Sequence, residues 1–511
     1  MISLVHSITV NGLDSTIIDI EVDINPWLPA FTIVWLPDQW VQESKERLRS
    51  ALKSSGAKLP TTRITVNLAP ANIKKSWPSF DLGIAVGILL DEWYIKDNSL
   101  IKDSIFLWEL SLDGSLRPIS SVLPATIGAK EKWFKRIFIP AQNVKEASII
   151  PDIEVIKIYT LSDMIDILNK EIDYMPEPIL TMQDVSRSIS FQDQYDFSHI
   201  VWQSFAKRAL EIAAAGWHNI LMEWPPGSGK TMLAKAFATI LPDLTIDEAI
   251  EISKIYSISW LLSNDVPIIT QRPFRSVHHT ASGTSIIGWG RNAWPWEISL
   301  SHKWVLFLDE ILEFPKTVLE VLRQPLEDGH ISVTRVNASY EYPAKFSLVW
   351  AMNPCPCWYL TDPDRDCICN PHQVSNYRSR LSGPLIDRID MYIEVPKVPT
   401  QDFKNSHTSQ EEASQSIKNR VQQAREKQIL RFTWTHLRSN SEMKTSDIKK
   451  YCQLESDGEV ILQQAINSMK LSARAYYRIL KLSRTIADLE DSDIIQTGHI
   501  LEALSYRKKE E

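Results

Sequence analysis

The sequence predicts a multidomain α/β protein, and three observations carry that prediction. Alternating apolar runs mix with helical patterns through the first third of the chain, which favours an α+β domain. A short buried strand, a glycine-containing loop and an amphipathic helix follow at residues 218–240, which is the context of a phosphate-binding core. Helical apolar spacing alone marks the C-terminal part, as in a helical lid. We therefore expect, in chain order, an N-terminal domain 1–170, a linker 171–197, a core 198–398, a linker 399–416 and a lid 417–511.

Composition limits the class of protein. The net charge of −8 argues against a generally basic nucleic-acid coat protein, although a ring-shaped motor can keep its basic residues in a pore. The N-terminus has no basic flank followed by a long apolar run, and the apolar stretch at residues 82–90 is too short to span a bilayer. We expect a soluble cytoplasmic protein without a membrane partner.

The loop after residue 223 is typical of nucleotide-binding proteins, with one departure. The motif G-x-x-x-x-G-K-[ST] is complete except for its first glycine, which is replaced by Trp224. Backbone N–H groups of such a loop cradle phosphates, Lys230 reaches the terminal phosphates and Thr231 holds Mg²⁺. A bulky indole conflicts with the tight turn expected at position 224. The predicted ligands are ATP and Mg²⁺, and the predicted binding residues are Trp224, Pro225, Pro226, Gly227, Ser228, Gly229, Lys230 and Thr231.

A second apolar strand, residues 304–310 (WVLFLDE), ends in two carboxylates. Asp309 is expected to hold Mg²⁺ through its water shell, and Glu310 to polarise the water that attacks the γ-phosphate. The alternative is an acidic pair that faces solvent at the end of a strand.

Four of the five cysteines are packed into residues 355–369, as two C-x-C pairs. Four thiolates in two tight pairs can meet a tetrahedral zinc ion, although C-x₂-C is the commoner spacing. The candidate zinc ligands are Cys355, Cys357, Cys367 and Cys369. The alternative is a set of reduced thiols that shape a loop.

Long phrases of the chain resemble one family. The stretches INPWLPAFTIVWLPD, RITVNLAPANIKKSWPSFDLGIAVGIL and LWELSLDGSLRPI resemble the N-terminal domain of the ComM/YifB family of magnesium-chelatase-like AAA+ ATPases, and the resemblance runs from about residue 1 to 508. It implies an N-terminal fold like the Lon protease domain (ribosomal S5 domain 2-like). Ser79 stands where Lon-type enzymes carry their nucleophile, but Leu123 stands where they carry the lysine base. We therefore expect no protease activity.

The resemblance also implies roles in an AAA+ core. Asn353, after the strand FSLVWAM, matches the position that orients the lytic water, although an Asn before Pro354 is also a common turn residue. Arg388 matches the arginine finger that reaches a neighbouring subunit's nucleotide, which implies a ring, expected to be a homo-hexamer. The alternative pairs Arg388 with Asp387 or Asp390. Arg474 matches an arginine that leans over the nucleotide from the lid.

Two further segments match pore-facing elements of such rings. Residues 271–303 match the family's helix-2 insert, and residues 326–346 read as a two-stranded hairpin turning near Arg335. The candidates for contact with DNA phosphates are Arg272, Arg275, His278, His279, Arg291 and Arg335, each of which alone is more commonly a solvated surface residue. The expected function is an ATP-driven DNA motor of the helicase or branch-migration type, acting in recombination or uptake of DNA. The alternative is a chelatase-type ATPase that remodels a protein partner without DNA.

Glycine is scarce and tryptophan abundant. The chain has 16 Gly and 18 Trp, so that the two together make up the share of about 7% that glycine alone usually has. Nine tryptophans stand where the resembling family carries glycine: Trp27, Trp35, Trp77, Trp108, Trp217, Trp224, Trp289, Trp304 and Trp358. We hypothesise that the codon UGA, read here as tryptophan, specifies glycine in the source organism. The alternative is a silent paralogue whose glycines have decayed.

Overall fold

The computed structural model divides the chain into two compact units, residues 1–188 with 246–270 and residues 189–245 with 271–511. Residues 246–270 lie inside the expected core 198–398, yet they belong to the first unit. The structure describes residues 2–34, 38–71, 80–107, 109–181, 195–200, 203–225, 229–262, 266–272, 274–281, 295–335, 338–396, 411–469 and 471–507. Ser79 and four of the nine tryptophans considered above lie outside these ranges: Trp35, Trp77, Trp108 and Trp289.

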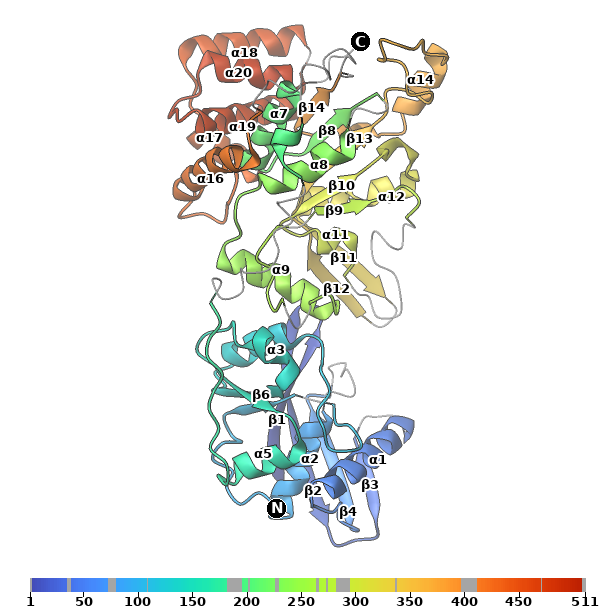
Figure 1. Ribbon diagram of the computed structural model, residues 1–511, viewed down its shortest axis with the longest axis vertical. Coiled ribbons are helices and arrows are strands. Elements are labelled where there is room, and N and C mark those ends of the chain that lie inside the picture. Colours follow the sequence, from blue (N-terminus) through green and yellow to red (C-terminus); the bar gives the residue numbers. More distant parts are fainter. Residues whose placement is uncertain are drawn as a thin grey trace. The chain divides into compact units, whose positions relative to one another are not determined.

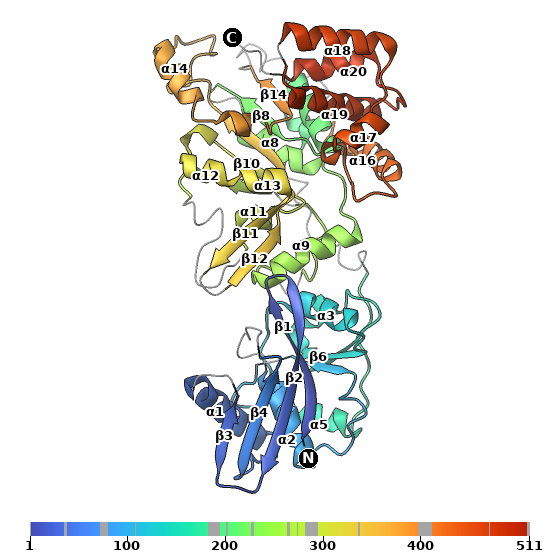
Figure 2. The ribbon, with the colours of Figure 1, turned by 180° about the vertical axis from the view of Figure 1, so that it is seen from behind.

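The first unit contains a seven-stranded mixed sheet of order β3-β4-β2-β1-β5-β6-β7, most of which is seen in Figure 2. Its strands are β1 (Ser3–Asn11), β2 (Asp14–Asn25), β3 (Ala30–Ile33), β4 (Arg63–Ala69), β5 (Ser104–Phe106), β6 (Arg136–Pro140) and β7 (Glu154–Ile158). The β1–β2 and β2–β4 pairs are antiparallel, and the other pairs are parallel. The alternating burial of β2 and β4 follows their alternating sequences, as predicted for an α+β domain.

The helices α1 (Asp38–Ser54), α2 (Asp81–Asp91), α3 (Val122–Glu131), α4 (Val144–Ala147) and α5 (Leu161–Leu168) surround this sheet, and α9 (Ile246–Ile258) packs against α3. Helix α2 is buried from Asp81 to Leu89, because it packs on the core face of β1 and β2. Leu123 is a fully buried residue of α3. Ile250 of α9 packs against the same core, and the Ser257 hydroxyl donates to Glu146 Oε1 at 2.5 Å. These contacts assign α9 to the first unit.

The second unit is built on a parallel five-stranded sheet of order β14-β8-β13-β10-β9 (Figure 1). The strands are β8 (Ile220–Glu223), β9 (Phe274–Val277), β10 (Val305–Leu308), β13 (Ser347–Met352) and β14 (Met391–Glu394). Every residue of β8, β10 and β13 is buried, which explains their continuous apolar sequences. The predicted strands near 218–223, 304–310 and 346–352 are therefore present.

Short helices and a hairpin surround this sheet: α7 (Ser204–Gly216), α8 (Lys230–Thr239), α11 (Glu297–Leu300), α12 (Lys316–Val321), α13 (Arg323–Asp328), α14 (Pro371–Arg378) and α15 (Gly383–Ile386). The predicted hairpin consists of β11 (His330–Arg335) paired antiparallel with β12 (Ala338–Pro343).

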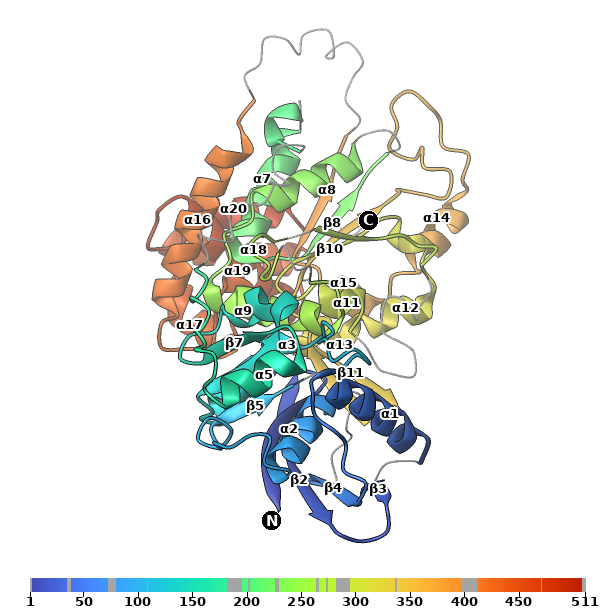
Figure 3. The same cartoon turned by 60° about the horizontal axis from the view of Figure 1, so that its bottom comes forward.

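The C-terminal part of the second unit is helical, as predicted. It contains α16 (Ser414–Arg431), α17 (Thr445–Tyr451), α18 (Ser456–Ser468), α19 (Ala473–Leu489) and α20 (Thr497–Ser505). Helix α16 begins at Ser414, inside the segment 399–416 that we expected to be a linker. Helices α16 and α19 pack on α7, so the lid shares the core of the second unit (Figure 3).

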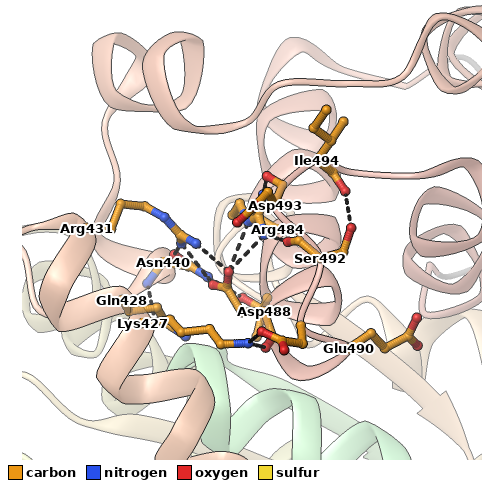
Figure 4. Close-up of polar contacts among 12 residues, drawn as sticks. Lys427, Gln428, Arg431, Asn440, Arg484, Asp488, Glu490, Ser492, Asp493 and Ile494 are labelled. Carbon is orange, nitrogen blue, oxygen red and sulfur yellow. Dashed lines mark hydrogen bonds and ion pairs between the residues drawn. The ribbon is translucent and has the colours of Figure 1, made fainter.

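A buried ionic network joins α16 to α19 (Figure 4). Both oxygens of Asp488 accept hydrogen bonds from Arg431, and Asn440 Nδ2 and Arg484 Nε donate to the same carboxylate at 2.8 and 3.1 Å. Arg484 also donates to the carbonyls of Ser492 and Asp493. The Asp488 and Arg484 side chains are 1% and 2% exposed, so this network replaces water for both charges.

Within the described part of the chain, none of the helices combines the length and the apolar composition that a membrane crossing requires.

Candidate functional site

The sequence-predicted ATP-binding residues lie at one edge of the parallel sheet. In the β8–β13 ladder Glu223 stands opposite Met352, and in the β10–β13 ladder Leu308 stands opposite Trp350. Parallel strands present their carboxyl ends at the same edge, and ligands of such sheets bind there. The loop after β8, the Asp309–Glu310 pair after β10 and Asn353 after β13 therefore meet.

Lys230 connects these segments. It is the first residue of α8, and its Nζ donates a hydrogen bond to Asn353 Oδ1. Burial lowers the pKa of the Lys230 amine, while the nearby charges of Asp309 and Glu310 act in the opposite direction. Asn353 is 2% exposed, so its amide is held inside the site. The structure thus brings together four of the predicted residues that come from three different segments.

The described ends of the phosphate loop have suitable backbone geometry. Gly229 precedes α8 with φ of 82°, a left-handed conformation that glycine adopts without steric cost. Thr231 is exposed in the first turn of α8, where backbone N–H groups and the helix dipole favour an anion. Pro225 is described, whereas Pro226, Gly227 and Ser228 lie outside the described residues.

Trp224 lies in the core of the second unit. Its side chain is fully buried, and its backbone N–H donates to the Met352 carbonyl at 3.1 Å, which extends the β8–β13 ladder by one residue. In the described part of the chain its indole Nε1 has no hydrogen-bond partner. A buried indole N–H usually finds an acceptor, so this environment does not suit tryptophan.

The acidic pair after β10 has a constrained geometry. Glu310 has φ of 52° and ψ of 49°, in the left-handed region, and its N–H donates to Asp309 Oδ1 at 2.9 Å. Glu310 Oε2 lies 3.0 Å from His279 Nδ1, and both side chains are 28% exposed. The pairing of His279 with Glu310 was not expected from the sequence, because the two residues are brought together only by the adjacent strands β9 and β10.

Comparisons with known proteins agree with this arrangement. Three family models match successive parts of the chain: "Subunit ChlI of Mg-chelatase" over residues 20–143, "Magnesium chelatase, subunit ChlI" over residues 196–403 and "Magnesium chelatase, subunit ChlI C-terminal" over residues 411–507. The competence protein ComM of Haemophilus influenzae is 40% identical over 508 residues, which cover 99% of this chain and 97% of that protein. The uncharacterized protein YifB of Escherichia coli is 38% identical, with coverage of 99% and 97%. The chain belongs to the ComM/YifB family of magnesium-chelatase-like proteins.

Membership in the ComM/YifB family supports a ComM-like ATPase that uses ATP and Mg²⁺. Lon protease 2 of Bacillus subtilis is 30% identical over 126 residues, which cover 24% of this chain and 22% of that protein. This partial match fits the likeness to Lon protease that the sequence predicts.

Two arginines that the ComM/YifB resemblance singles out lie in a separate cluster of charges. Arg388 donates to Glu327 and to the Pro384 carbonyl, rather than to Asp387 or Asp390, which were the alternative partners considered from the sequence. Arg474 Nη1 lies 3.6 Å from Asp387, and its side chain is 63% exposed.

The candidate DNA contacts of this ComM/YifB-family chain differ in their surroundings. Arg272 donates hydrogen bonds to the carbonyls of Pro242 and Lys303, both at 2.7 Å, so its guanidinium links two segments of the second unit. Arg275 Nη1 lies 3.6 Å from Glu297, and exposed His278 bonds to Thr280. Arg335 ends β11 opposite Ala338, and Arg291 lies outside the described residues.

The four predicted cysteine ligands converge between Asn353 and α14. The Sγ atoms of Cys355, Cys357 and Cys367 are 3.3 to 3.6 Å apart, and all four Sγ atoms, including that of Cys369, lie within 4.8 Å of one another. Four sulfurs at about 2.3 Å from a tetrahedral zinc ion stand about 3.8 Å apart. The donor set therefore fits zinc in both chemistry and spacing.

The sequence reasoning missed a buried acid beside the site. Glu223, the last residue of β8, is 2% exposed and accepts hydrogen bonds from Arg378 Nη2 at 2.9 Å and from the Tyr392 hydroxyl. A carboxylate at the end of an otherwise apolar buried strand is the signal that could have indicated such a partnered charge.

Proposed function

We propose that this ComM/YifB-family protein is an ATP-driven motor that acts on DNA as a ring of identical subunits, of the helicase or branch-migration type. The observation that carries the proposal is the meeting of Lys230, Asp309, Glu310 and Asn353 at one edge of a parallel sheet. The name of the full-length relative, a competence protein, supports a role in recombination or uptake of DNA. The basic candidates after β9 and at the end of β11 are the proposed contacts to phosphates.

The described residues fit Mg²⁺-bound ATP. A Cβ at Gly229 would meet nothing within 4 Å, so the approach to the start of α8 is open. The half-buried Lys230 amine is expensive to desolvate, and a polyanionic ligand offsets that cost. When bound, Mg²⁺-ATP supplies the reactive phosphoanhydride and the cation that neutralises its developing charge. Lys230 would bind the terminal phosphates, Asp309 would hold Mg²⁺, Glu310 would orient and deprotonate the attacking water, and Asn353 would fix the position of that water.

In the ring that we propose, Arg388 would serve the nucleotide of a neighbouring subunit. The Arg388 side chain is 11% exposed and that of its present partner, Glu327, is 57% exposed, so a phosphate would replace the Glu327 carboxylate at a guanidinium that is mostly buried. Arg388→Ala should then lower the rate of ATP hydrolysis and leave ATP binding to the same subunit unchanged. Equal losses of binding and hydrolysis would contradict the assignment.

ATP hydrolysis with and without branched DNA tests the leading proposal. Lys230→Ala should lower kcat/KM at least about a hundredfold, because it removes a charge that binds the transferred phosphate. Lys235→Ala is the matched control, since Lys235 lies on the same helix but donates to the Tyr195 hydroxyl at 3.0 Å. A Lys230→Ala protein with wild-type hydrolysis would remove the motor assignment.

The action on DNA is tested by the salt dependence of ATP hydrolysis. Stimulation by DNA should fall steeply between about 50 and 200 mM salt, because phosphate contacts release counterions. Hydrolysis that DNA neither stimulates nor makes salt-dependent would favour the alternative, a chelatase-type ATPase that remodels a protein partner. The net charge of −8 and the internal hydrogen bonds of Arg272 are the observations that favour this alternative.

We also propose that Cys355, Cys357, Cys367 and Cys369 hold a structural zinc ion, which would fix the loop that follows Asn353. Elemental analysis of the purified protein should find one zinc per chain, and Cys367→Ser should lose it. Cys452→Ser is the matched control, because Cys452 is a buried cysteine in the lid, remote in sequence from the cluster. Metal-free wild-type protein with four reduced thiols would refute the site.

A further inference from the structure

Tryptophan is concentrated at strained positions of the backbone. Eleven described residues other than glycine have positive φ, and five of them are tryptophan, although a share of 18 in 511 predicts fewer than one. The five φ values are 60° for Trp93, 66° for Trp133, 62° for Trp217, 56° for Trp260 and 75° for Trp358. A bulky side chain is rare in this left-handed region, which costs a residue with a Cβ about 1–2 kcal/mol and glycine nearly nothing.

Four of these five tryptophans follow helices at the position that glycine prefers. The Trp133 N–H and the N–H that follows it donate to carbonyls of α3 at 2.9 and 3.1 Å, which is the hydrogen-bond pattern of a Schellman motif. Trp260 repeats this pattern after α9, with bonds of 3.3 and 3.0 Å. Trp93 follows α2, and Trp217 is the C-cap of α7.

Glycine itself occupies the same position after another helix of the first unit. Gly56 follows α1 with φ of 79°, and its N–H and the next N–H donate to carbonyls of α1 at 3.3 and 2.9 Å. This is the bond pattern found at Trp133 and Trp260. Lys170 and Asp491 also have positive φ after helices, so a residue with a Cβ is tolerated there at a cost.

The side chains of the strained tryptophans do not offset this cost by burial. Trp93 and Trp133 are 79% and 91% exposed, and Trp260 and Trp358 are exposed as well. A large apolar side chain that stays in water contributes little hydrophobic stabilisation. Glycine at positions 93 and 133 would therefore remove the backbone strain with almost no loss of buried area.

A different observation marks Trp224. Its side chain is fully buried, and its indole Nε1 has no hydrogen-bond partner in the described part of the chain. A buried indole N–H usually finds an acceptor. Glycine at position 224 would remove the unpaired donor, and it would complete the motif G-x-x-x-x-G-K-[ST] that ends at Thr231.

We infer that the protein made by its source organism carries glycine at positions 93, 133, 217, 260 and 358, and by the same codon at position 224. The family resemblance singled out positions 217, 224 and 358, whereas positions 93, 133 and 260 rest on backbone geometry alone. Decay of glycines would leave varied residues, but tryptophan recurs at these positions. The inference concerns the identity of residues, so it holds whether or not the proposed ATPase function does.

The gene and the protein from the source organism test the inference directly. The gene should carry the codon UGA at all six positions, and a UGG codon at any of them would overturn the inference for that position. Peptide mass spectrometry of the protein should find glycine at positions 93, 133 and 260. Indole-containing peptides at these three positions would overturn the inference as a whole.

Hydrogen exchange of recombinant full-length protein tests the backbone argument separately. Trp133→Gly relieves the left-handed backbone at a residue that is 91% exposed, so the exchange of protected α3 amides should slow about fivefold. Trp133→Ala is the matched control, because it removes the same indole but keeps a Cβ, and it should not slow exchange. Equal slowing by the two substitutions would refute the backbone argument.

Gly56→Ala provides the reverse measurement. A Cβ at Gly56 would meet nothing within 4 Å, so the substitution adds left-handed strain without a clash. Exchange in α1 should become about fivefold faster, and an unchanged rate would contradict the cost assigned to these positions. Trp434 is 97% exposed and is absent from the positive-φ residues of the described chain, so Trp434→Gly should not slow exchange in α16, which precedes it. Slower exchange in this variant would attribute the gain to loss of an exposed indole instead.

Discussion

The contribution of the Asp488 network to the stability of the lid can be measured by removing the Asp488 carboxylate. Asp488→Ala would leave Arg431 and Arg484 without their shared carboxylate, although their side chains are only 18% and 2% exposed. Burial alone would lower the pKa of Arg431, but hydrogen bonds and charge from Asp488 raise it, so the carboxylate compensates for the desolvation of the guanidinium. Removal of one partner from such a buried cluster costs about 3–5 kcal/mol.

Hydrogen exchange of lid peptides is the appropriate assay, because the chain has two compact units and global unfolding need not be two-state. A loss of about 3–5 kcal/mol should speed the exchange of protected amides in α16 and α19 by about two to three and a half orders of magnitude. Asp491→Ala is the matched control, since Asp491 pairs with Lys427 but its side chain is 87% exposed. The reasoning is refuted if Asp488→Ala exchanges at the rate of Asp491→Ala.

Two other variants separate structural from functional roles. Arg272→Ala should destabilise the second unit by about 2 kcal/mol in chemical denaturation, because the Arg272 guanidinium donates hydrogen bonds to carbonyls of its own unit. The salt dependence of DNA binding should not change. A variant with wild-type stability and a changed salt dependence would instead show that Arg272 contacts DNA. Burial alone would raise the pKa of Asp390, but His218, Arg478 and the Asn219 N–H hold it well below its ordinary value. Asp390 therefore stabilises the fold above its unfolded-state pKa of about 3.9, and this contribution is lost as the pH falls through the lower folded-state pKa. The wild-type unfolding free energy should drop below about pH 4, and a wild-type slope in Asp390→Asn would contradict this.

The predictable features were those fixed by local sequence. Strands β10 and β13 are continuous apolar runs, so a fully buried position in a parallel sheet is the simplest way to satisfy them. Asp309 and Asn353 come directly after these strands, and they lie at the same edge of the sheet because the strands are parallel. The antiparallel partners β11 and β12 were likewise predictable, because a short polar turn separates two short alternating runs.

The features that sequence could not predict depend on contacts between distant residues. Helix α9 has an ordinary amphipathic sequence, and only its packing and the bond from Ser257 to Glu146 assign it to the first unit. The contact between His279 and Glu310 depends on the register of β9 against β10. Family resemblance gave a role to Arg388 but no partner, since Glu327 is an unremarkable surface acid in the sequence.

The Asp488 cluster and the Arg388–Glu327 pair of the second unit differ in how far their acidic partners are exposed. Asp488 is enclosed with its arginines, so any change there disrupts the lid, and no ligand can compete for it without unfolding. Arg388 instead pairs with Glu327, whose side chain is 57% exposed, while the Arg388 side chain is 11% exposed, so only the acidic partner of this pair lies mostly in water. In the ring that we propose, a nucleotide phosphate from an adjacent subunit would offer more negative charge than Glu327, and it could form a bidentate contact with Arg388. An enclosed ion-pair cluster in the lid and an arginine whose acidic partner is exposed are both compatible with the ring that we propose.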